Sequence, residues 1–95
     1  MKMAYLFLYN DEVGTREKIT QVLDRMSRVI TWRYDMPHCY YVISESTAEE
    51  LHQQFQLING NLGRYLFIEA SANRQGWMLK DTWYLLTNKT HRPKV

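Results

Sequence analysis

The chain has 95 residues, which indicates a single domain. Its formal net charge is +2, from 12 Lys and Arg against 10 Asp and Glu, and three of the bases lie in the C-terminal segment 89–95. Without that segment the acidic residues exceed the basic ones by one. The composition therefore argues against the broad basic face that is typical of proteins binding nucleic acid without sequence preference.

Cysteine usage and hydropathy limit the compartment and the partners. The single cysteine, Cys39, excludes a disulfide framework within one chain and is typical of a reducing environment, so we expect a cytoplasmic protein. The apolar run at the N-terminus is too short for a signal peptide and leads directly into charged residues. No stretch approaches the length of a membrane span, so we expect no membrane partner.

The first half of the chain predicts a strand, a helix and a hairpin. Residues 3–9 are a continuous apolar and aromatic run, which suits a central strand buried on both faces. Gly14 and Thr15 then open a helix. Residues 29–35 switch to a two-residue period and form a hairpin with residues 39–44. Ile19, Val22, Leu23 and Met26 fall on one stripe of the helix, and Ile30, Trp32 and Tyr34 share one face of the first hairpin strand.

The second half predicts another helix, a fourth strand and a short third helix. Thr47 with Glu50 three residues later is a capping box, and the helix that it opens ends at the Asn- and Gly-rich segment 59–63. Residues 64–70 form the fourth strand, and residues 79–87 form the third helix. Ala48, Leu51, Phe55 and Ile58 lie on one side of the second helix, and the inward residues of the third are Leu79, Trp83 and Leu86.

This order of elements predicts an α+β fold, a ferredoxin-like βαββαβ sandwich with an extra C-terminal helix. We expect residues 1–88 to form this single domain and residues 89–95 to be a basic flexible tail. Two helices would cover one face of the sheet, yet both faces are apolar, since Phe7 and Leu8 point to opposite sides. The third helix can cover part of the second face, and a second subunit in a two-fold homodimer is the expected cover for the rest.

The first candidate site is Asn10 and Asp11 at the end of the first strand. A carboxylate at a strand end beside a dimer seam can bind a divalent ion, and such an ion can activate water for phosphodiester cleavage. The alternative is a turn, because Asn and Asp favour bends and helix approaches. The spacing alone favours the turn.

The second candidate is a group of Asp35, His38 and Cys39, whose side-chain types suggest a zinc site. In a hairpin, however, His38 and Cys39 point to opposite faces, and no second cluster in the sequence supplies further ligands. We therefore interpret Cys39 as a small core residue and His38 as a polar group of the hairpin.

Other motifs point less clearly to chemistry. The predicted order of elements occurs in RNA-recognition modules, which stack bases on an exposed sheet. The strand 39–44 has the aromatic residues of that signature without its glycine and base, so we expect a buried dimer or helix contact for these rings. The tail could add phosphate contacts, although a solvated end is the favoured interpretation. Ser44, Ser46 and Ser71 have no adjacent base, so nucleophilic catalysis has no support.

Three segments carry a resemblance to a known family. They are YLFLYND at 5–11, WRYDMPHCYYVISESTAEEL at 32–51 and RYLFIEASANRQGWMLKDTWYLL at 64–86. Through them the chain resembles the small ferredoxin-like proteins associated with CRISPR spacer acquisition, in particular their stand-alone SinR-like, endoribonuclease-like relatives. The resemblance covers almost the whole chain and consists mainly of hydrophobic patterns.

The resemblance implies a homodimer with the first strand near the two-fold axis. Some members are similar to metal-dependent ribonucleases or deoxyribonucleases, with an aspartate that ends the first strand of each subunit. Others hold DNA or a partner integrase without cleavage, and related folds occur in toxin–antitoxin systems. The family aspartate follows the strand's tyrosine directly, whereas here Asn10 follows Tyr9 and Asp11 lies one residue further on. We therefore expect a nucleic-acid-related protein with weak or absent metal-dependent nuclease activity.

If the protein cleaves RNA or DNA, four residues are the candidates. Asp11 from both subunits would hold Mg²⁺ at the dimer interface, Asn10 would orient water or phosphate, and Arg16 and Arg33 would contact the phosphate. The alternative function is a non-catalytic protein-interaction module, an antitoxin-like or scaffold dimer, which the near-neutral body of the chain favours. A small-ligand sensor on the same scaffold has no specific residues to support it.

Overall fold

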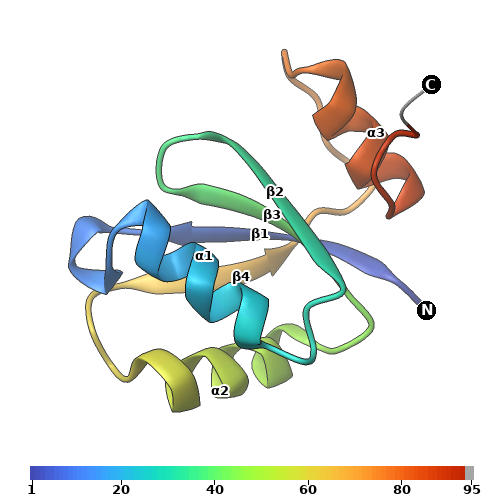
Figure 1. Ribbon diagram of the computed structural model, residues 1–95. Helices are drawn as coiled ribbons and strands as arrows, with labels where there is room; N and C mark the ends of the chain where they lie inside the picture. Colours follow the sequence, from blue (N-terminus) through green and yellow to red (C-terminus); the bar gives the residue numbers. More distant parts are fainter. Residues whose placement is uncertain (94–95) are drawn as a thin grey trace.

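Four strands form one antiparallel sheet in the order β2-β3-β1-β4 in the computed structural model of the chain, which describes residues 1–93 (Figure 1). Three α-helices and one 3-10 helix complete this described part. The predicted α+β class, with a four-stranded antiparallel sheet and three helices, is therefore confirmed. The elements are β1 (Met3–Tyr9), η1 (Asp11–Val13), α1 (Arg16–Arg25), β2 (Thr31–Met36), β3 (Cys39–Ser44), α2 (Ala48–Asn59), β4 (Tyr65–Glu69) and α3 (Lys80–Asn88).

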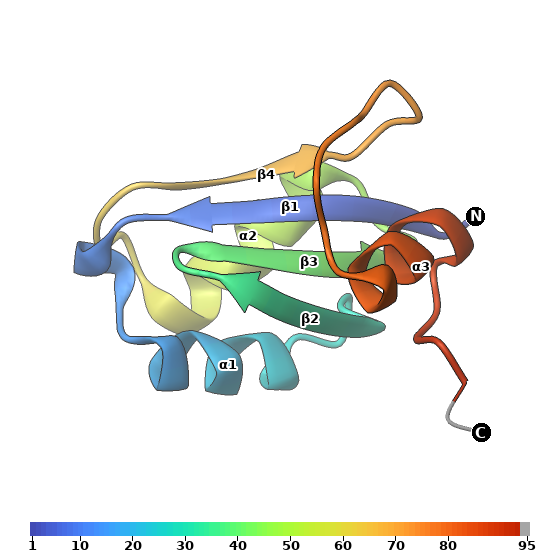
Figure 2. The ribbon, with the colours of Figure 1, turned by 90° about the horizontal axis from the view of Figure 1, so that it is seen from above.

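The two faces of the sheet have different covers. Figure 1 shows α1 and α2 together on one face, which we call the α1/α2 face, and α3 on the opposite side. Figure 2, seen from above, shows α3 over one end of the strands, with the segment that joins it to β4 arching across the sheet. We call this second side the α3 face, and it is covered over only part of its extent.

β1 is central because its side chains are apolar on both sides. It pairs with β3 and with β4, so that Phe7 lies opposite Tyr40 on one side and opposite Phe67 on the other. The predicted central strand at residues 3–9 is confirmed, with Phe7 fully buried. Leu8, on the α3 face, keeps 38% of its surface exposed, so the cover of that face is incomplete.

The main core lies between the sheet and the pair α1 and α2. Both helices begin where the sequence predicts: the Thr15 side chain accepts the Lys18 N–H, and Thr47 and Glu50 form the reciprocal capping box. These caps satisfy backbone groups that the first helical turn leaves unpaired. The core residues include Tyr5, Phe7, Tyr40 and Val42 from the sheet and Ile19, Leu23, Leu51 and Phe55 from the helices.

A smaller apolar cluster lies beneath α3, and its composition corrects the prediction for this helix. Leu79 is the N-cap of α3 and is 58% exposed, so its predicted inward position is wrong. Leu86 is buried as predicted, and Trp83 is partly buried against the same cluster. Thr82 and Leu85 take the other inward positions. Residues three and four apart share one face of a helix, and Thr82 is three residues from Leu85 and four from Leu86.

The described part of the predicted tail makes contacts with the domain. A hydrogen bond of 2.6 Å joins the Thr31 hydroxyl and His91 Nε2, and Arg92 Nε lies 2.7 Å from Asp81 Oδ1. Lys94 and Val95, which belong to the tail predicted as flexible, lie outside the described residues.

Candidate functional site

Asn10 closes the end of the β1–β4 pair. Its backbone N–H donates to the Arg64 carbonyl at 3.0 Å, and its side-chain oxygen accepts the Arg64 N–H at 3.1 Å. Gly63 approaches so closely that a Cβ placed on it would lie 2.5 Å from the Asn10 side-chain oxygen. The Asn10 side chain, which was predicted to orient water or phosphate, is thus occupied in joining two strands.

Asp11 lies in η1, the single helical turn that follows β1, which agrees with the turn that the spacing favours. Its carboxylate oxygen is 2.6 Å from His38 Nε2, in the turn between β2 and β3. The two side chains are 92% and 49% exposed, respectively for Asp11 and His38. The pair therefore bridges two turns at the surface, where water competes for both groups.

Arg16, at the start of α1, is bound to the same hairpin. Its guanidinium donates to the Met36 carbonyl at 2.6 Å and to the Cys39 carbonyl at 3.4 Å. The guanidinium carbon also lies 4.0 Å from the centre of the Tyr34 ring, within the range of a cation–π contact. The structure therefore brings Asn10, Asp11 and Arg16 to one end of the sheet, with Arg16 holding the hairpin in place.

Arg33 lies apart from these residues, on the α3 face. Its Nε donates to the Thr82 hydroxyl at 2.9 Å, and its Nη1 is 3.9 Å from an oxygen of Asp81. The Thr82 hydroxyl in turn donates to Asp35, whose other oxygen accepts the Tyr41 hydroxyl at 2.6 Å. The guanidinium that was predicted to contact phosphate thus belongs to a polar network that attaches α3 to β2 and β3.

The same network changes the titration of one ring. Burial, and then the hydrogen bond to the Asp35 carboxylate, raise the pKa of Tyr41 far above its usual value near 10. Tyr41 and Tyr40 are both buried, so the predicted buried contact for the rings of strand 39–44 is confirmed.

No group of three or more His, Cys, Asp or Glu side chains within residues 1–93 is arranged to hold a metal ion. Mg²⁺ prefers several oxygen ligands, and the neighbour of Asp11 is the imidazole of His38 rather than another carboxylate. Cys39 is buried in the cluster beneath α3, which confirms its interpretation as a core residue.

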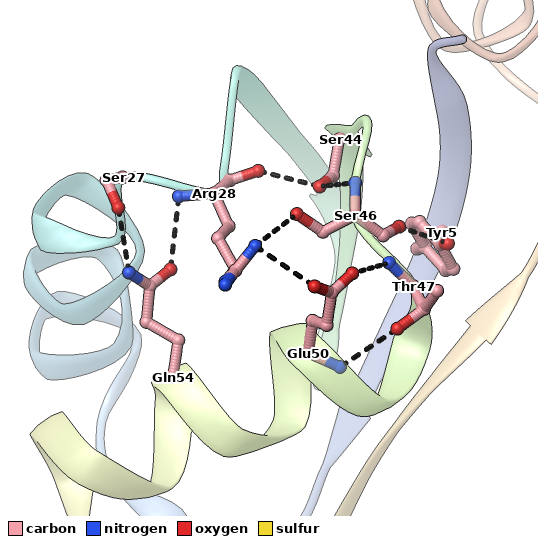
Figure 3. A network of polar contacts seen from close by, with 8 residues as sticks. All are labelled: Tyr5, Ser27, Arg28, Ser44, Ser46, Thr47, Glu50 and Gln54. Atoms are coloured by element: carbon pink, nitrogen blue, oxygen red, sulfur yellow. Dashed lines mark hydrogen bonds and ion pairs between the residues drawn. The ribbon is translucent and has the colours of Figure 1, made fainter.

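A polar clamp that the sequence analysis did not identify connects the segments that follow α1 and β3 to α2 (Figure 3). The Arg28 guanidinium donates to the Ser46 hydroxyl at 3.1 Å and lies 3.3 Å from the Glu50 carboxylate. Gln54 accepts the Arg28 N–H and donates to Ser27. An open groove of about 500 Å³ lies beside the clamp. Its polar groups bond to one another, so we interpret the clamp as structural.

The most distinctive surface feature lies on the α3 face. Six large apolar side chains are between 38% and 99% exposed there or on the segment leading into α3. We call this set the exposed apolar strip. Its members are Leu8, Met36, Leu66, Ile68, Trp77 and Leu79.

The strip is hollowed by two neighbouring depressions. A groove of about 350 Å³ is lined by Leu6, Leu8 and Ile68 from the strands, and by Met78 and Trp83 from the side of α3. A smaller hollow of about 190 Å³ lies between Met36 and residues 77–79. Met36 and Met78 line both, so the two are adjacent. The predicted apolar character of this second face is therefore present, and α3 leaves part of it open.

Comparison of the chain with protein-family models, with curated proteins and with solved structures gives no significant match. None of the helices within residues 1–93 has both the length and the apolarity that crossing a bilayer requires.

Proposed function

We propose that this protein is an interaction module that acts as a homodimer, in which two copies pack their α3 faces against each other. The observation that carries the proposal is the exposed apolar strip. Soluble monomers seldom expose a contiguous apolar patch above about 300–600 Å². Taking roughly 200 Å² for each fully exposed large side chain, the exposed fractions of the strip amount to roughly 700 Å².

This area is of the size that association requires. Each partner in a standard protein interface contributes about 800 Å², with an apolar centre and a polar rim. The strip alone supplies most of such a contribution. Burial of its apolar surface would favour association, because transfer of apolar area out of water is the main driving force for such contacts.

The shape of the α3 face favours a second copy as the partner. α3 and the segment before it are raised over one end of the strands, and the other end is uncovered (Figure 2). A two-fold axis would place the raised end of each copy over the uncovered end of the other. Such a contact uses the same patch twice and closes after two copies. The near-neutral body of the chain opposes this contact little.

The topology supports a ferredoxin-like assignment for the module. Strand order β2-β3-β1-β4 with the succession β1, α1, β2, β3, α2, β4 is the split βαβ arrangement. Proteins that share this arrangement differ widely in function, so the assignment adds no activity by itself.

Sedimentation velocity of the whole chain over a wide range of concentrations tests the proposal. We expect a dimer that dissociates on dilution. Leu66→Lys, which puts a charge into the strip, should shift the protein to monomer, whereas Leu57→Lys should not. Leu57 is 87% exposed on α2 and lies outside the strip, so it is a matched control. A monomer at every concentration, or equal effects of both substitutions, would overturn the proposal.

A second candidate function is the nucleic-acid-related, metal-dependent nuclease that the family resemblance implies. The observation in its favour is the exposed carboxylate of Asp11 at the end of β1. Asp11 from two copies would hold Mg²⁺ in a dimer that brings the ends of the two β1 strands together, which is a different arrangement from packing of the α3 faces. Asn10 and Arg16 lie at the same end of the sheet, although both are engaged in hydrogen bonds of the fold.

Incubation with labelled single-stranded RNA and duplex DNA, with Mg²⁺ or Mn²⁺ and with EDTA, tests this second candidate. Cleavage that needs the metal and is lost in Asp11→Ala would support it. Cleavage that survives Asp11→Ala would assign the activity to another site or to a contaminant. A gel shift without cleavage would support nucleic-acid binding alone.

A further inference from the structure

Trp77 has an exposure that is unusual for its residue type. It is 99% exposed, whereas tryptophan is on average among the more buried side chains. The other two tryptophans have partners: Trp32 donates its indole N–H to Asp24 at 2.7 Å, and Trp83 packs against the cluster beneath α3. Trp77 is therefore the one tryptophan whose side chain, the largest of any residue type, is exposed to water almost completely.

A site of suitable chemistry lies on the same face. The groove of about 350 Å³ is lined mainly by apolar groups, including Leu6, Leu8 and Ile68. It is large enough for one aromatic side chain, and it lies between the strands and the segment that joins β4 to α3, which contributes Ser71 and Asn73. Met78 forms one wall of the groove, whereas its neighbour Trp77 lines only the smaller hollow beside it. The chain thus leaves its own groove unfilled and its own indole in solvent.

We infer that Trp77 of each copy inserts into the groove of the other copy in the proposed homodimer. The inference rests on the proposed self-association and specifies its central contact. Each copy carries both an indole and a groove. A two-fold axis therefore makes the same contact twice, so that both indoles are buried and both grooves are filled. Tryptophan is enriched among the few interface residues that carry most of the binding energy, because it fills a pocket with a large rigid surface.

The area of the strip agrees with this arrangement. Trp77 contributes the largest exposed fraction of the six strip residues. Without its burial the remaining five side chains fall well short of the roughly 800 Å² that each partner of a stable interface contributes. The dimer therefore depends on the indole more than on any other single side chain of the strip.

The test compares Trp77→Ala with Leu57→Ala by sedimentation velocity of the full chain. Because both side chains are exposed, neither substitution should change the urea midpoint of the monomer. We expect Trp77→Ala to raise the dimer dissociation constant by roughly 30-fold or more, and Leu57→Ala to leave it unchanged. Subtracting the fluorescence spectrum of Trp77→Ala from that of the wild type gives the emission of Trp77. This emission should shift to shorter wavelength as the wild type dimerises.

Each outcome separates this inference from the proposed function. A wild-type dimer whose dissociation constant is the same in Trp77→Ala would overturn the insertion and leave the homodimer standing. A wild-type monomer up to near-millimolar concentration would overturn both. If the emission of Trp77 keeps the long wavelength of a solvent-exposed indole in the dimer, the insertion is overturned. The indole would then lie at the rim of the interface or be free for another partner.

Discussion

The carboxylate of Asp11 and the imidazole of His38 lie 2.6 Å apart, although 27 positions separate them in the chain. The contact joins η1, at the end of β1, to the turn between β2 and β3. It explains where the one carboxylate with a predicted catalytic role points. It also gives His38 the polar hairpin position that its place in the sequence predicts.

Removal of this pair should have little effect on stability. We expect Asp11→Ala to change the free energy of unfolding by less than about 1 kcal/mol, because exposed ion pairs contribute little. Urea denaturation of Asp11→Ala and His38→Ala measures the effect. A loss well above this value in both variants would mean that the pair holds the two turns together more firmly than its exposure indicates.

Removal of Asp35 should affect α3 more strongly. The Asp35 carboxylate accepts hydrogen bonds from the hydroxyls of Tyr41 and Thr82, both on or near the buried cluster. Asp35→Ala leaves these donors without their acceptor, which should cost about 1–3 kcal/mol. In Asp35→Ala, hydrogen exchange relative to the wild type should become faster at the amides of α3 more than at those of α2. Asp35→Asn, which keeps one acceptor, should lie between the wild type and Asp35→Ala; equal exchange in all three would contradict the role of the network.

Gly63 and Gly60 provide a matched pair for backbone strain. Both have positive φ, +68° and +75°, so alanine at either position is strained by about 1 kcal/mol or more. At Gly63 a Cβ would also lie 2.6 Å from the Val13 nitrogen, whereas nothing lies within 4 Å at Gly60. We expect Gly63→Ala to destabilise the fold by at least about 1 kcal/mol more than Gly60→Ala in urea denaturation. Equal losses would show that the Asn10 turn adjusts at little cost.

Alkaline pH should destabilise the fold. Burial raises the pKa of Tyr41 and of the Cys39 thiol, so the folded state keeps protons that the unfolded chain releases. The stabilising contribution is complete below the ordinary thiol value of 9.0 and is lost as the pH rises through the folded values. Urea denaturation as a function of pH should show this fall, and Tyr41→Phe should reduce its slope. A flat profile above the ordinary tyrosine value of 10.0 would contradict the prediction.

The Cys39 thiol should be nearly inert in the native protein. It is 3% exposed, and its raised pKa lowers the thiolate fraction that reacts with alkylating reagents. We expect iodoacetamide to modify it at the rate of local or global opening, and rapidly in denaturant. Native alkylation as fast as that of a free thiol would mean that α3 opens readily.

The sequence was sufficient to predict the elements whose signals are local. The strand at 39–44 and the capping box of Thr47 and Glu50 agree with the structure residue by residue, because β-propensity and capping depend on near neighbours. The strand predicted at 29–35 begins at Thr31, since the Val29 N–H still bonds to Met26 in the preceding turn. The prediction of two apolar sheet faces followed from the alternation within β1 and β4.

The contacts of the candidate site residues could not be predicted in this way. Arg16 and Arg33 bond to groups 20 and 49 positions away, and their partners include a backbone carbonyl that no sequence motif marks. The exposed apolar strip has the same limitation. Its members could be assigned to a face, but which of them remain uncovered depends on where α3 lies, and the inward stripe of α3 was predicted wrongly at Leu79.

The ten residues between β4 and α3 form a segment at which a protease can cut the chain in two. Exposed positions there include Ser71, Ala72, Asn73, Gln75 and Gly76, and proteases prefer such segments. A single cut would leave all four strands with α1 and α2 in one fragment and α3 in the other. Only non-covalent contacts would then hold α3, so a synthetic peptide of residues 77–93 could replace it, and the complementation would report directly on the docking of that helix.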